Sequence, residues 1–87
     1  MDINLLKQVL YKAGDVISAK ITQDMFEAIA GSCSILGAGN DIKLVANSMV
    51  AERLSKRLLE SKELTYYGKI GLLDDCIQAL ENGEIDE

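Results

Sequence analysis

Residues 3–19, INLLKQVLYKAGDVISA, carry the clearest structural pattern in this sequence of 87 residues. At the angular step of an α-helix, the large apolar side chains of this stretch fall within an arc of about 140°. An arc of that width is typical of an amphipathic helix with one face in a hydrophobic core. We therefore predict a helix over residues 3–19 whose buried face consists of Leu5, Leu6, Val9, Leu10, Ala13, Val16 and Ile17.

A second helix is predicted from about Thr22 to Leu36. Thr22 is a favourable N-cap, and Asp24 would lie in the positively polarised first turn. Ile21 and Phe26 are spaced as a hydrophobic staple. The run Gly37-Ala38-Gly39 is expected to end this helix.

A third and longer helix is predicted over residues 41–62, with Asn40 or Asp41 as its cap. Its apolar surface is wider than one stripe, so we expect it to be covered on more than one side. One face is defined by Ile42, Val45, Ala46, Met49 and Val50. Ala51, Leu54 and Leu58 carry it round the helix by more than about 100°, and Leu44 and Leu59 widen it further.

A fourth helix is predicted over residues 65–82, followed by an acidic tail, 83–87, that is expected to fray. Gly68 and Gly71 weaken its beginning. Tyr66 and Tyr67 therefore have two alternatives, a helix or an extended turn, and we expect a helix from about Lys69 onward.

The fold class follows from these patterns and from composition. The chain is 48% hydrophobic and contains no proline, which favours a packed domain of uninterrupted helices. We predict one all-α domain over residues 1–87, a small bundle of about four helices. Its core is expected to include Leu5, Val9, Val16, Phe26, Ile29, Met49, Leu54, Leu73 and Leu80, and Phe26→Ala is expected to come close to unfolding it.

The sequence offers little for catalysis, so we do not expect an enzyme, a metal site or a cofactor. The chain has no histidine, which removes the commonest general base and metal ligand. Cys33 and Cys76 each fall in an apolar arc, where thiols behave as small hydrophobic groups. The neighbouring carboxylates Asp74 and Asp75 would point about 100° apart on a helix. The sequence also lacks a signal peptide and an apolar run of membrane-spanning length, so we expect a cytoplasmic protein.

Charge is distributed unevenly along the chain, whose net charge is −5. Residues 63–87 carry seven acidic side chains against Lys69 alone, which disfavours nucleic-acid binding. The short basic segment is the exception, because Arg53 and Arg57 lie four residues apart on one helix face. They either pair with acids of the same chain or bind an anion or an acidic partner. The candidate binding residues are Arg53, Lys56, Arg57, Tyr11, Tyr66 and Tyr67.

These features favour a small acidic regulatory or inhibitory protein that acts by binding another protein. Small acidic proteins of this kind are common among phage products. The alternatives are a nucleotide- or small-molecule-binding helical oligomer that uses the arginine pair and a tyrosine, and a DNA-binding regulator. We also expect a homodimer formed through the third helix, which Val50→Glu would split. The candidate self-association residues are Val45, Met49, Val50, Leu54 and Leu58.

Overall fold

Four α-helices and no strand make up the described part of the chain. The structure, a computed structural model, describes residues 1–19, 24–60 and 65–83, and within them all side chains except those of Ala19 and residues 57–60. The helices are α1 (Ile3–Ala19), α2 (Met25–Leu36), α3 (Asn40–Glu60) and α4 (Tyr66–Glu81). None of them combines the length and the apolar character that crossing a membrane requires. The predicted all-α, four-helix fold class is thus confirmed.

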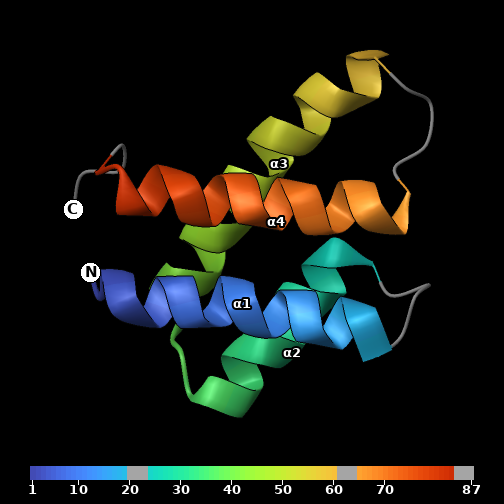
Figure 1. Ribbon diagram of the computed structural model, residues 1–87. Helices are drawn as coiled ribbons and strands as arrows, with labels where there is room; N and C mark the ends of the chain where they lie inside the picture. The colour runs from blue at the N-terminus through green and yellow to red at the C-terminus, as the bar shows by residue number, and fades with distance from the viewer. Residues whose placement is uncertain (20–23, 61–64, 84–87) are drawn as a thin grey trace.

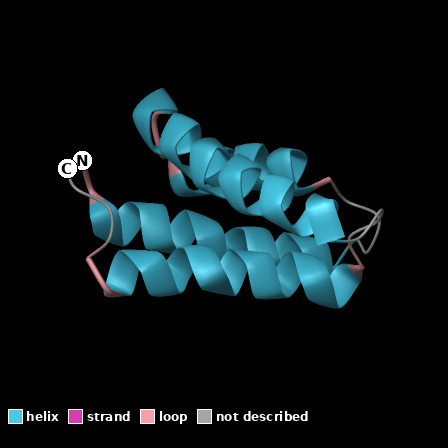
Figure 2. Ribbon diagram, turned by 90° about the horizontal axis from the view of Figure 1, so that it is seen from above, coloured by secondary structure: helices cyan, strands magenta, loops and turns pink. Residues whose placement is uncertain are grey.

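The helices are arranged in two layers. α1 and α4 run side by side in opposite directions, so the start of α1 and the end of α4 lie at the same end of the molecule (Figure 1). α2 and α3 form the other layer, and α3 crosses steeply behind α1 and α4 (Figures 1 and 2). The radius of gyration, 12.0 Å, equals the value of about 12 Å expected for a compact chain of this length.

α1 is the central element of the core. It packs against all three other helices. Of the seven residues predicted for its buried face, five are buried, and Leu5 and Val16 are half-buried against the core. Five residues of α1 have no exposed surface at all: Leu6, Val9, Leu10, Ala13 and Ile17.

The start of α2 differs from the prediction. The helix begins at Met25 with Asp24 as its N-cap, whereas Thr22 lies outside the described residues. The backbone N–H groups of Phe26 and Glu27 donate to Oδ1 of Asp24 at 2.9 and 3.4 Å. Those groups have no partner within the helix, so one carboxylate satisfies two donors. At the other end Gly37 adopts a left-handed conformation, φ 69°, as the predicted C-terminal stop requires.

The fourth helix begins earlier than Lys69. The hydroxyl of Thr65 accepts the backbone N–H of Gly68 at 3.0 Å, and the helix runs from Tyr66. The extended-turn alternative for Tyr66 and Tyr67 is therefore wrong, because a good N-cap outweighs the weak propensity of Gly68 and Gly71. The predicted end of the third helix, Lys62, lies outside the described residues, as do residues 84–87 of the predicted frayed tail.

The predicted core is confirmed at its centre and wrong at its edges. Val9, Ile29, Met49, Leu73 and Leu80 are buried, whereas the other four predicted residues are only half-buried. Phe26 is one of these four, since it lies in the first turn of α2, where its neighbour Met25 takes the inward position. We therefore expect Phe26→Ala to cost less than full burial would imply. The half-buried set is Leu5, Val16, Phe26 and Leu54.

Candidate functional site

The inner side of α3 belongs to the core of the single chain. Ile42, Ala46, Met49 and Val50 are buried at the spacing of one helix face. Two of the five predicted self-association residues, Met49 and Val50, are therefore not available to a second molecule, because they face the chain's own helices. Val50 has no exposed surface, so Val50→Glu would act on folding rather than on association.

Two further self-association candidates lie at the border of this inner side. Val45 and Leu54 are half-buried and pack against the core. The side chain of Leu58 lies outside the described residues. Among the predicted residues whose side chains are described, Val45 and Leu54 are the ones that present a substantial part of their surface to the outside.

The outer side of α3 carries an exposed apolar residue that was not among the predicted candidates. Leu44 is 66% exposed. Ser48, Ala51 and Ser55 follow at successive intervals of about one helical turn and are also exposed, so these positions carry no charged side chain. The signal for it was present in the sequence, since Leu44 widened the apolar arc of the third helix.

A shallow hollow lies beside Leu44 on the same helix. Its volume is about 260 Å³. It is lined by Leu44, Val45, Ser48, Met49 and Glu52. The last four are spaced i, i+3, i+4 and i+7, the spacing of the four residues that receive one side chain of a neighbouring helix in knobs-into-holes packing. Ser48 is small, which gives the hollow its depth. The arrangement has the form of an unfilled helix-packing hole.

Arg53 and Lys56 each contact a group of their own helix. Arg53 is half-buried, and its Nη1 donates to the backbone carbonyl of Met49 at 3.4 Å. Lys56 pairs with Glu52 at 3.6 Å, an exposed pair of small energetic value. The side chain of Arg57 is outside the described residues, and within them neither Arg53 nor Lys56 bonds to a tyrosine.

Two of the predicted tyrosines form a cluster at the start of α4. Their rings meet edge to face, with centroids 5.2 Å apart. The hydroxyl of Ser18 donates to the carbonyl of Gly14 at 2.9 Å, so in the 2.9 Å bond between the Tyr66 and Ser18 hydroxyls the tyrosine is the donor. Tyr66 thus fastens α4 to α1, whereas Tyr67 is 82% exposed.

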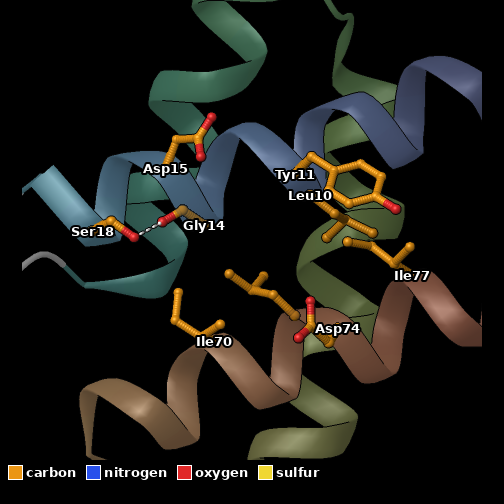
Figure 3. Close-up of a pocket in the computed structure, with 9 residues that line it drawn as sticks. Leu10, Tyr11, Gly14, Asp15, Ser18, Ile70, Asp74 and Ile77 are labelled. Atoms are coloured by element: carbon orange, nitrogen blue, oxygen red, sulfur yellow. Dashed lines mark hydrogen bonds between the residues drawn. The ribbon is translucent and has the colours of Figure 1, made fainter.

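A groove of about 190 Å³ lies between α1 and α4, on the side of the pair away from α3 (Figures 1 and 3). The third predicted tyrosine, Tyr11, stands at its edge and is 56% exposed. The sequence did not predict this groove, because it depends on the register between two helices. Its floor is apolar and its edge polar, and it is lined by Leu10, Tyr11, Gly14, Asp15, Ser18, Ile70, Leu73, Asp74 and Ile77.

Gly14 lies in this groove although the packing of α1 does not require a glycine there. A Cβ atom at this position would lie 3.9 Å from Cδ1 of Ile70 and 4.0 Å from Cδ1 of Leu73, which are ordinary contact distances. A glycine within a helix costs about 0.5–1 kcal/mol relative to alanine. Because Gly14 has no methyl group, space remains between α1 and α4.

The two thiols are buried, and neither forms a disulfide. Burial raises the pKa of the Cys33 thiol from its ordinary value of 9.0, and the nearby charge of Lys43 offsets this only in part. The thiol therefore stays protonated at neutral pH, the opposite of an activated nucleophile. Within the described ranges no three acidic or cysteine side chains converge as metal ligands.

Comparison with known protein families, with curated proteins and with solved structures finds no significant match for this chain. Its function is therefore argued from its own surfaces. Two of them combine shape with chemistry. One is the outer face of α3, which we define as its exposed or half-buried residues Leu44, Val45, Ser48 and Glu52. The other is the groove between α1 and α4.

Proposed function

We propose that this chain is a non-enzymatic regulatory or inhibitory protein that acts by binding another protein. The observation that carries the proposal is the unfilled helix-packing hole on the outer face of α3, with Leu44 exposed beside it. A side chain from another helix fits such a hole, whereas a small polar ligand gains nothing from it.

The energetic gain of covering this face is modest but useful. Burying a whole leucine side chain is worth about 1.5–3 kcal/mol, so covering the exposed two-thirds of Leu44 contributes about 1–2 kcal/mol. In a symmetric pair this gain is made twice, once for Leu44 of each copy. Set against the cost of association, a gain of this size supports only weak and reversible pairing.

The first partner that we propose for this face is a second copy of the chain. Closed two-fold symmetry is the commonest form of self-association, and it places the same surface of both copies in contact. Of the predicted self-association residues, Val45 stays part of this contact. The exposed Leu44 is its main residue, in place of the buried Met49 and Val50. The face then serves to assemble the protein.

Sedimentation velocity on two matched variants tests the proposal. Leu44→Glu places a negative charge on the outer face of α3, whereas Gln8→Glu places the same charge at an exposed position of α1. We expect the wild type and Gln8→Glu to sediment as dimers and Leu44→Glu as a monomer, because an unpaired charge cannot be buried in an apolar contact. Dimers that persist in Leu44→Glu would exclude this face as the contact.

A further inference from the structure

We infer that the groove between α1 and α4 binds an arginine side chain of the protein that this chain regulates. The inference rests on the proposed protein-binding function but uses a different surface. Seen from the groove, α3 crosses behind α1 and α4, so pairing through α3 leaves the groove open (Figures 1 and 3).

The size of the groove selects one side chain rather than a cofactor. Its volume, about 190 Å³, is below the range of roughly 300–1,000 Å³ that is typical of sites for small molecules and cofactors. It is formed by two antiparallel helices and is open at the surface. An extended side chain from a neighbouring protein can enter it without being enclosed.

The floor of the groove suits the aliphatic part of a long basic side chain. Leu10 and Leu73 are buried, and Ile70 is half-buried beside them. The methylene groups of arginine cover apolar surface of this kind while the guanidinium remains near water. Gly14 keeps the space open, because a methyl group there would lie against Ile70 and Leu73.

The edge of the groove is acidic and carries an aromatic ring. Asp74 points from α4 toward α1, the ring of Tyr11 extends toward Ile77, and Asp15 stands on the outer edge of α1 (Figure 3). Among the described residues, no basic side chain lines the groove and neither carboxylate is in an ion pair. The charge of the groove is therefore complementary to a cation from outside the chain.

An apolar floor with a carboxylate and an aromatic ring at the edge favours arginine over lysine as the bound side chain. A guanidinium is planar, so it can stack on the face of Tyr11 and present two parallel donors to the carboxylate of Asp74. It also gives up its hydration more readily than an ammonium group does. These three properties match an aromatic ring and a carboxylate on opposite sides of a narrow groove.

Two-dimensional NMR on the wild type tests the inference with acetyl-arginine methylamide as the probe. Acetyl-citrulline methylamide has the same shape without the charge and is the matched control. We expect the arginine probe, with a dissociation constant in the millimolar range for so small a ligand, to shift the amide signals of Gly14, Ile70 and Asp74. The citrulline probe should leave them unchanged, and Asp74→Asn should weaken arginine binding about three- to tenfold, whereas Asp75→Asn should not.

Three results would overturn the inference. Equal shifts from the two probes would reduce the groove to an apolar surface, and no shifts from either would exclude a site. Binding of free arginine without binding of the blocked probe would indicate a small-molecule site instead of a protein contact. Repeating the titration on Leu44→Glu separates the two proposals, because that variant alters the outer face of α3 and leaves the groove intact.

Discussion

α1 and α3 use their apolar side chains in different ways. α1 places its inner stripe wholly inside the molecule, with Leu10 at 0% exposure, and contacts all three other helices. α3 also fills an inner stripe, but it leaves Leu44 at 66% exposure on its opposite side. The inner stripe of α1 is therefore used in folding, whereas α3 has apolar surface beyond what folding needs. We attribute that surplus to binding.

The largest expected difference in folding stability is between two variants that place the same charge on opposite sides of α3. Val50→Glu would put an unpaired carboxylate where no surface is exposed, and we expect a loss of about 5 kcal/mol, which is comparable to the whole stability of a domain this small. Leu44→Glu should retain the helical circular dichroism spectrum and, at concentrations low enough for both variants to be monomers, a melting temperature near that of Gln8→Glu. Cooperative folding of Val50→Glu would contradict the division of α3 into an inner and an outer side.

A smaller difference in folding stability is expected when leucine is replaced by alanine on α1 and on α3. Leu10→Ala should lower the free energy of unfolding by about 2–5 kcal/mol, because it leaves a cavity in the core. Leu44→Ala should change it by less than about 0.5 kcal/mol in the monomer, since most of that side chain already faces water. Urea denaturation measures both values. Equal losses would show that Leu44 also supports the fold.

The smallest changes in folding stability are expected from replacing either of two helical glycines by alanine. Gly14→Ala on α1 and Gly31→Ala on α2 should each raise the free energy of unfolding by about 0.5–1 kcal/mol, because both glycines are helical and neither position has an atom closer than 3.9 Å to an added Cβ. Only Gly14→Ala narrows the groove. It should therefore weaken binding of the blocked arginine probe, while Gly31→Ala leaves that binding unchanged. A loss of binding in both variants would indicate an effect unrelated to the groove.

The sequence predicted the four helices because their apolar periodicity is a local property. The extent of α1 was predicted without error, and Gly37 ends α2 as expected. The N-cap of α2 was misassigned, since Thr22 and Asp24 both have capping side chains and only the backbone geometry selects between them.

The candidate site was less predictable than the fold. The width of the apolar arc on the third helix was visible in the sequence, but which part of it faces inward depends on how the other helices pack. Met49 and Val50 were therefore assigned to the wrong side, while Leu44 was passed over. The groove joins Tyr11 on α1 to Asp74 on α4, two residues whose proximity follows only from tertiary packing.

Pairing of two copies through the outer face of α3 can be detected in the unmodified protein from its molar mass in solution. Light scattering coupled to size-exclusion chromatography gives this mass independently of shape, over a series of loading concentrations. If the outer face of α3 pairs two copies, the mass approaches twice the 9.5 kDa of the single chain as concentration rises. A mass that stays at 9.5 kDa over the whole series would show that the chain does not pair through this face.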